Sequence, residues 1–191
     1  PMADFVFDLH SGGSSLHYLP TTLLLWSEDE AARAEQIAFA NVFGSDFACF
    51  FKGDHGGTSS SAAALRQGVK GVSVELGGSG RVSMDALRTC ERGIANLLDH
   101  IGVVEGFGQA TDTPKPRLLQ AMSSESFVFA FDNGVFEPVV SLGDEVRVGQ
   151  LAARIHDVET PWTAPKEVRF EAEGSVICQR AYGRAERGDC L

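Results

Sequence analysis

Two polar side chains stand at the ends of predicted strands, and a glycine-rich turn follows each of them. His10 comes directly after the apolar run at residues 5–9 and before a Ser-Gly-Gly sequence. Glu75 lies near the end of the β-branched run at residues 71–76 and precedes a Gly-Gly-Ser-Gly sequence. A histidine in this place could be a metal ligand or a general base. Burying a carboxylate costs free energy, so a buried strand rarely ends on an acid without a reason. The glycines that follow let another group approach closely.

The two residues together indicate more than either one alone. In open α/β sheets, ligands bind outside the carboxyl ends of the strands, so we expect His10 and Glu75 to face one crevice. A histidine ligand and a glutamate base are the minimal set for metal-assisted hydrolysis. Taken singly, each residue is better explained without a function: His10 as a hydrogen-bonded turn histidine, and Glu75 as an exposed strand end.

Other polar residues give weaker signals. Asp8 could orient a metal ligand or could face a helix layer. His17 and His55 lie in predicted loops near the same strand ends, and Arg81 could reach a substrate carboxylate, but we expect these three to be surface residues. No G-x-S-x-G sequence is present, which disfavours a serine hydrolase.

The elements that must position these side chains alternate along the first part of the chain. Ser27 and Glu30 have capping-box spacing at the start of one helix, and Gly44 is placed to end it. Ser83 and Gly102 have the corresponding places in another helix. Alternation of apolar strands with helices predicts an α/β fold with a mostly parallel sheet and flanking helices. We predict strands at residues 5–9, 46–51 and 71–76, and helices at 27–44, 58–68 and 83–102.

The pattern changes around residues 108–117, where proline and threonine replace the helical periodicity. Short apolar segments bounded by glycine, aspartate or proline follow, as is typical of an antiparallel all-β module. We therefore predict two domains, residues 1–112 and 113–191. A weak internal repeat in the second resembles the halves of a biotinyl/lipoyl-type barrel-sandwich. Lys166 lies between the halves, but its sequence is not the carrier motif, so we expect a structural relative and not a carrier.

Composition excludes several classes of protein. The chain has 191 residues, of which 43% are hydrophobic, and no apolar run is long enough for a membrane helix. A net charge of −10 disfavours nucleic acid as a partner. The four cysteines are far apart, which is typical of a cytoplasmic protein without disulfides. Because Pro1 precedes a retained Met2, we expect a piece of a longer protein.

The sequences DLHSGGSSLHYLP and VSVELGGSG together resemble the succinylglutamate desuccinylase/aspartoacylase family. Its members are zinc amidohydrolases related to the zinc carboxypeptidases, and the resemblance is strongest to the branch with N-acetyl-diaminobutyrate deacetylases. It implies a carboxypeptidase-like sheet, one Zn²⁺ per complete site, His10 as the third zinc ligand and Glu75 as the residue that activates the zinc-bound water. It also implies that the β-module shapes the rim of the site.

The family's other two ligands form an H-x-x-E motif on the amino side of the DLH strand, together with an arginine that binds substrate. We expect this chain to lack both. A literal H-x-x-E runs from His156 to Glu159, but it falls in the predicted β-module and in the wrong order, so we expect a solvated loop.

These observations favour a zinc-dependent amide hydrolase that removes the acyl group from an N-acylated small amino acid. Its partner would be that small molecule, with neither nucleic acid nor membrane, and a homo-oligomer is left open. Three alternatives stay: a truncated or degenerate relative that acts as a binding or regulatory module, a carrier or transport adaptor modified on Lys166, and a carboxypeptidase-like peptidase.

Overall fold

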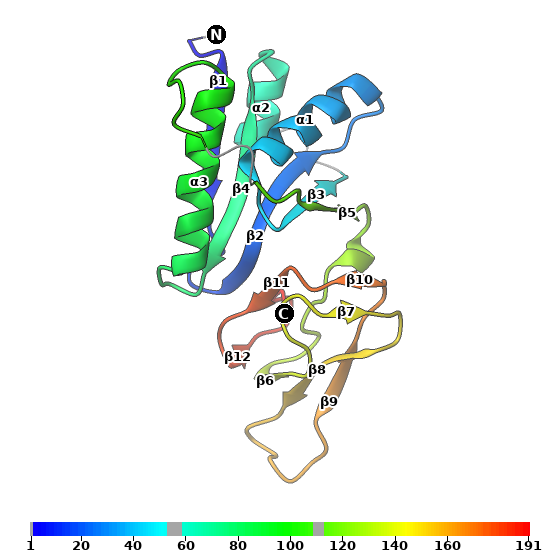
Figure 1. Cartoon of the computed structure of the whole chain (residues 1–191). Coiled ribbons are helices and arrows are strands. Elements are labelled where there is room, and N and C mark those ends of the chain that lie inside the picture. The colour runs from blue at the N-terminus through cyan, green and yellow to red at the C-terminus, as the bar shows by residue number, and fades with distance from the viewer. Residues whose placement is uncertain (1, 53–58, 109–112) are drawn as a thin grey trace. The chain divides into compact units, whose positions relative to one another are not determined.

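The computed structural model describes residues 2–52, 59–108 and 113–191, and the chain forms two compact units (Figure 1). The first unit comprises Pro1–Ser11, Leu19–Gly77 and Val82–Met122. The second comprises Ser123–Leu191 together with two short segments, Gly12–Tyr18 and Gly78–Arg81. The segments that directly follow the strands of His10 and Glu75 in sequence therefore group with the second unit.

The first unit is built on a mixed sheet with strand order β1-β4-β2-β3-β5. Strand β1 pairs in parallel with β4, and β3 pairs in parallel with both β2 and β5. The strands predicted at residues 5–9, 46–51 and 71–76 are confirmed as β1, β3 and β4. The bounds are Phe5–His10 for β1, Leu16–Leu25 for β2, Phe47–Phe51 for β3, Lys70–Gly78 for β4 and Arg117–Ala121 for β5.

Two strands were not predicted. In β2, Pro20 and two threonines interrupt the apolar pattern, yet Thr21 and Thr22 are fully buried. Their hydroxyls have partners inside the protein: Thr21 donates to the Leu19 carbonyl at 2.8 Å, and Thr22 lies 2.7 Å from the Ser45 hydroxyl. Paired polar groups can enter a core at little cost. The other strand, β5, lies beyond the predicted boundary at residue 112 and extends the sheet of the first unit.

The predicted helices are confirmed as α1 (Glu30–Phe43), α2 (Ser60–Arg66) and α3 (Met84–His100). Ser83 caps α3 as expected, because its side chain accepts a hydrogen bond from the Ala86 amide. Of the helices in the described ranges, none has the length and the apolar character needed to cross a membrane.

The predicted cap of α1 is wrong at its start and confirmed at its end. Asp29, not Ser27, is the N-cap, and its carboxylate accepts from the Ala31 amide at 2.9 Å. Ser27 instead accepts from the Asp29 amide at 3.1 Å, so it supports the cap from one step upstream. Gly44 ends the helix in the left-handed region with φ of 73°. Asp and Ser are comparably good N-caps, so the sequence did not separate the two positions.

The two faces of β1 and β4 carry different side chains because successive residues of a strand point to opposite faces. Val72 and Val74 of β4 pack with Phe39 and Phe43 of α1 and with Leu97 of α3. The alternate residues of β4 therefore point to the opposite face of the sheet. That second face carries the candidate site.

The second unit contains a four-stranded sheet of order β12-β6-β8-β9 and the antiparallel pair β10-β7, while β11 pairs with the first residues of β2. Between residues 123 and 191 the only helix is a single 3₁₀ turn, Ser124–Ser126. The barrel-sandwich likeness and the domain boundary stay predictions. The bounds are Gly134–Pro138 for β6, Glu145–Val146 for β7, Leu151–His156 for β8, Lys166–Arg169 for β9, Gly174–Ser175 for β10, Cys178–Arg180 for β11 and Arg184–Ala185 for β12.

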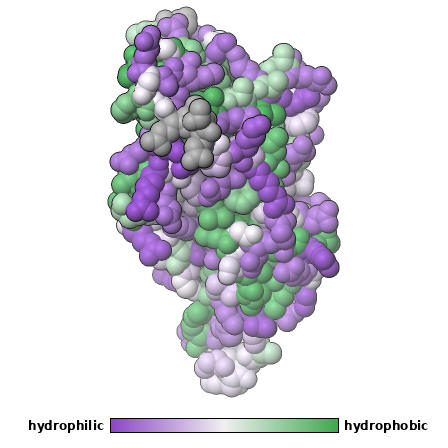
Figure 2. All heavy atoms as spheres, in the orientation of Figure 1, coloured by the Kyte–Doolittle hydropathy of each residue, from purple (hydrophilic) through white to green (hydrophobic). Residues whose placement is uncertain are grey.

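Residues 127–131, one of the short apolar segments of the predicted β-module, form only an isolated bridge, Phe129 to Cys190. They still alternate, since Val128 and Ala130 belong to the core of the second unit while Phe127 and Phe129 are exposed. Hydrophobic residues of this kind are interspersed among hydrophilic ones on the face drawn in Figure 2.

We predict that Gly93→Ala destabilises the first unit. Alanine would favour the helix by about 1 kcal/mol, but a Cβ at Gly93 would lie 2.5 Å from the fully buried Phe43 ring. Overpacking of this kind costs about 1–3 kcal/mol, so the net change should be a loss of stability. Urea unfolding, followed by the helical circular dichroism signal, measures it.

The control is Glu91→Ala, at an exposed position of α3, which should change stability by less than about 0.5 kcal/mol. A Gly93→Ala variant as stable as the control would show that the α1–α3 contact is looser than described.

Candidate functional site

The strand register places His10 beside Glu75. In the parallel pair of β1 and β4, His10 is the register partner of Glu75, and Asp8 is the partner of Ser73. Side chains of register partners, and of residues two apart on a strand, share a face of the sheet. The four side chains therefore lie together on the face opposite the α1–α3 core. The pair His10 and Glu75 is the nearer of the two pairs to the carboxyl ends of the strands.

Asp8 contacts His10 directly. Its Oδ1 lies 2.8 Å from Nε2 of His10, whose side chain is 47% exposed. The other carboxylate oxygen, Oδ2, accepts a hydrogen bond from the Ser60 hydroxyl at the start of α2. Desolvation acts to raise the pKa of Asp8, but the hydrogen bonds from Ser60 and His10 outweigh it and hold the pKa below its ordinary value. Asp8 is thus ionised and faces the histidine, not a helix layer alone.

Glu75 is half-buried, and its Oε2 is a buried atom that has no hydrogen-bond partner among the described residues. Burial raises the pKa of Glu75, with the charge of His10 opposing this shift and the charge of Asp8 adding to it. Buried polar atoms almost always have a partner, so this carboxylate oxygen is available to accept a hydrogen bond from a bound molecule. A carboxylate with a raised pKa can also accept and release a proton near neutral pH.

The donor set around His10 is smaller than a metal requires. Asp8 occupies Nε2 of His10, which leaves Nδ1 as the nitrogen for a metal; a metal-binding histidine almost always directs its other nitrogen to such a partner. A catalytic zinc takes three protein ligands. Within residues 2–52, 59–108 and 113–191, however, no group of three His, Cys, Asp or Glu side chains could hold a metal ion. The described residues therefore supply one candidate zinc ligand, His10, and its orienting partner, Asp8, but not a complete zinc site.

The weaker candidates near the strand ends lie in the second unit or outside the described residues. Nδ1 of His17 is 3.0 Å from the hydroxyl of Ser79, and both residues belong to the second unit. Arg81 is exposed and forms an isolated bridge with Gly78. His55 lies outside the described residues.

The literal H-x-x-E motif is placed in the second unit. His156 ends β8, and its Nε2 lies 2.6 Å from Oε2 of Glu137, while Glu159 follows in a turn. Lys166 begins β9 and forms an ion pair with Asp132. The side chains of His156 and Lys166 thus have ordinary partners within the second unit, and the backbone amide of Glu159 donates to Asp157 in the turn.

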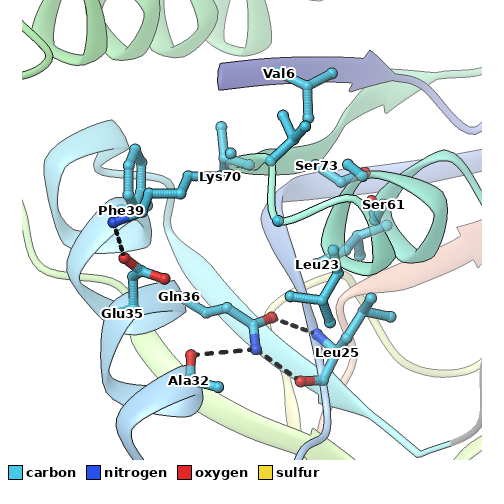
Figure 3. A pocket seen from close by; sticks show the side chains of 16 residues that line it. Val6, Leu23, Leu25, Ala32, Glu35, Gln36, Phe39, Ser61, Lys70 and Ser73 are labelled. Carbon is cyan, nitrogen blue, oxygen red and sulfur yellow. Dashed lines mark hydrogen bonds and ion pairs between the residues drawn. The ribbon is translucent and has the colours of Figure 1, made fainter. Parts of the chain in front are cut away.

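A cavity of about 100 Å³ lies at the start of β4 (Figure 3). Glu75 lies near the other end of that strand. Gln36 of α1 holds the last residue of β2 by accepting from the Leu25 amide at 2.7 Å and donating to its carbonyl at 2.9 Å. Lys70 pairs with Glu35 at 2.6 Å. These groups were not singled out from sequence, and their polar atoms already have partners.

Ser60 is the site residue that sequence reasoning missed. The serine run at residues 59–61 indicated only a helix start, and a helix start does not say which strand it faces. The contact with Asp8 joins residues 52 positions apart, and no local pattern encodes it.

The raised pKa of Glu75 predicts a pH-dependent stability. Because the folded-state pKa lies above the ordinary 4.5, the folded chain binds this proton more tightly than the unfolded chain. The free energy of unfolding therefore falls as pH rises from 4.5 through the raised pKa. Glu75→Gln removes this penalty, so the variant should be the more stable at neutral pH and lose its advantage below 4.5. Urea unfolding at both pH values measures it.

Glu91→Gln, on the exposed side of α3, serves as the control and should change stability little at either pH. A Glu75→Gln variant that gains stability at acid pH instead would reverse the sign and contradict the burial of this carboxylate.

Comparisons with known proteins agree on one family. Residues 1–101 match the model of the succinylglutamate desuccinylase/aspartoacylase catalytic domain. The whole chain is 34% identical to 56% of the N-alpha-acetyl-L-2,4-diaminobutyric acid deacetylase of Halomonas elongata.

Two solved structures match the full chain with a TM-score of 0.91. One is a succinylglutamate desuccinylase/aspartoacylase from Rhodobacter sphaeroides (35% identity, 57% of that chain), and the other is the product-bound ectoine utilization protein EutE (DoeB) from Ruegeria pomeroyi (31% identity, 57% of that chain). The chain spans little more than half the length of these relatives. On this sequence and structural evidence, the chain belongs to the succinylglutamate desuccinylase/aspartoacylase family.

Proposed function

We propose that this chain carries part of the active site of a zinc-dependent deacylase that acts on N-acylated small amino acids. The observation that carries the proposal is the register of β1 and β4, which sets His10 beside Glu75 with Asp8 on the far nitrogen of the histidine. The hydrolytic class is supported by the names of the relatives, which are a deacetylase and desuccinylase/aspartoacylase proteins.

His10 acts as one zinc ligand through Nδ1. Asp8 accepts a hydrogen bond from Nε2–H of His10, which favours the tautomer whose Nδ1 carries the lone pair that binds a metal. When bound, the zinc lowers the pKa of its water and polarises the amide carbonyl. A catalytic zinc needs three protein ligands, and we place the other two outside the residues that the structure describes.

Glu75 acts as the general base and then as the general acid. Its Oε2, which has no hydrogen-bond partner among the described residues, can accept a hydrogen bond from the attacking water, and burial raises the pKa of the carboxyl group toward neutral pH. Glu75 takes one proton from the water as the new C–O bond forms, and gives it to the nitrogen of the leaving amine as the C–N bond breaks. Its carboxylate is then ionised again.

The substrate we propose is an N-acetylated diamino acid of the kind named for the Halomonas elongata relative. A peptidase of the carboxypeptidase kind is the second candidate, because the same ligand and base would hydrolyse a peptide bond. A binding module without catalysis is the third, because the described residues alone supply only one ligand.

The test uses three variants of the protein as its gene encodes it. Glu75→Gln should keep its zinc and lose about 10²–10⁴-fold in kcat, the usual contribution of a general base. His10→Ala should lose most of its zinc. The control, His156→Ala, replaces a histidine that pairs with Glu137 in the second unit and should keep both zinc and activity. Elemental analysis gives the zinc per chain, and amine release from N-α-acetyl-L-2,4-diaminobutyrate gives the rate.

Zinc retained in His10→Ala, or full activity in Glu75→Gln, would refute the assigned roles. Hydrolysis of peptides without hydrolysis of N-acetyl amino acids would favour the peptidase. Zinc binding without turnover of either substrate would favour the binding module.

A further inference from the structure

We propose that Ser60 is a positioning residue for this site: it fixes the carboxylate of Asp8 and, through Asp8, the tautomer and ring orientation of His10. The inference rests on the proposed role of His10 as a ligand. All three residues belong to the first unit.

The two oxygens of Asp8 are held from two different elements. Oδ1 lies 2.8 Å from Nε2 of His10 on the same strand, and Oδ2 accepts from the hydroxyl of Ser60 on α2. A carboxylate with one partner can turn about its last side-chain bond and exchange its oxygens, because that torsion is broad. With one partner on each oxygen, the carboxylate plane is fixed. Ser60 supplies the second of these partners, and it comes from α2 and not from β1.

The orientation of Asp8 decides the state of His10. A neutral imidazole carries one proton, and an acceptor at Nε2 favours the tautomer with the proton there. Nδ1 then keeps the lone pair that a metal requires. Since the side chain of His10 is 47% exposed, packing alone does not hold the ring, and the hydrogen bond that Nε2–H donates to Asp8 has a correspondingly larger share in its orientation.

The hydroxyl of Ser60 is not needed to start its helix. Ser59 is the N-cap of α2, and its side chain accepts from the Ala62 amide at 3.2 Å. Ser60 is the first residue of the helix and directs its hydroxyl to Asp8. Removing that hydroxyl therefore leaves the cap in place, which separates a positioning role from a purely structural one.

The next serine provides a matched control. Ser61 is also on the first turn of α2 but lines the cavity near the start of β4, close to Ser73 in Figure 3. Ser60→Ala and Ser61→Ala thus make the same chemical change at neighbouring positions of one helix. Ser60→Thr keeps the hydroxyl and serves as the rescue.

The first measurement is the tautomer of His10 in the zinc-free protein as its gene encodes it. Multiple-bond ¹H–¹⁵N spectra of histidine-labelled protein report the protonated nitrogen, and His10→Ala identifies the signal. Wild type, Ser60→Thr and Ser61→Ala should show the Nε2–H form. Ser60→Ala should shift toward a mixture of tautomers while its thermal midpoint matches that of Ser61→Ala.

The second measurement is the zinc dissociation constant, by competition with a chelator. Ser60→Ala should weaken zinc binding by about 10-fold, the lower end of the range of about 10–100-fold for partners of metal-binding residues, because Ser60 acts on His10 through Asp8. Ser60→Thr should restore the wild-type value, and Ser61→Ala should not change it.

A His10 tautomer unchanged in Ser60→Ala would overturn the positioning role, and so would an equal loss of zinc affinity in Ser60→Ala and Ser61→Ala. Failure of the proposed function looks different: wild type and His10→Ala would then bind zinc equally or not at all. In that case the tautomer spectra, which need no metal, still decide whether Ser60 acts through Asp8.

Discussion

The parallel register between β1 and β4 is the constraint on which the rest of the site depends. It makes His10 and Glu75 neighbours, and one residue of slip would turn one of them to the core face of the sheet. Close approach of the two strands requires glycine at Gly71, where a Cβ would lie 1.9 Å from the Val6 carbonyl oxygen. The α1–α3 core then fixes the register from behind, because Val72 and Val74 are buried on the opposite face.

The two carboxylates on the site face of β1 and β4 have different surroundings, and these surroundings suit them to different roles. Asp8 has a donor on each oxygen and stays ionised, whereas Glu75 is desolvated and keeps one oxygen without a hydrogen-bond partner among the described residues. One carboxylate is thus suited to hold a neighbour, and the other is suited to exchange a proton. The distinction comes from partners and burial, since both residues lie on the same face of neighbouring strands.

The strands that carry His10 and Glu75 and the start of α3 were predictable because local patterns encode them. The apolar run before His10, the β-branched run before Glu75 and the serine cap of α3 each lie within a few residues. What the sequence did not reveal depends on contacts between distant residues. The buried threonines of β2 are polar in sequence and acceptable only because Thr22 meets Ser45. The sequence around Ser60 indicates only a helix start, whereas the structure shows that its hydroxyl contacts Asp8.

The glycines after the two site strands have a structural cause that the sequence analysis described only as room for an approaching group. A Cβ at Gly78 would lie 2.1 Å from the Leu16 carbonyl oxygen, and one at Gly12 would lie 2.4 Å from the same atom. The approaching group is therefore backbone, and the two turns are joined by hydrogen bonds from the Ser79 amide to Leu16 and from the Gly80 amide to Gly13. Sequence showed that something comes close at these turns, but only the structure shows that each turn is the close neighbour of the other.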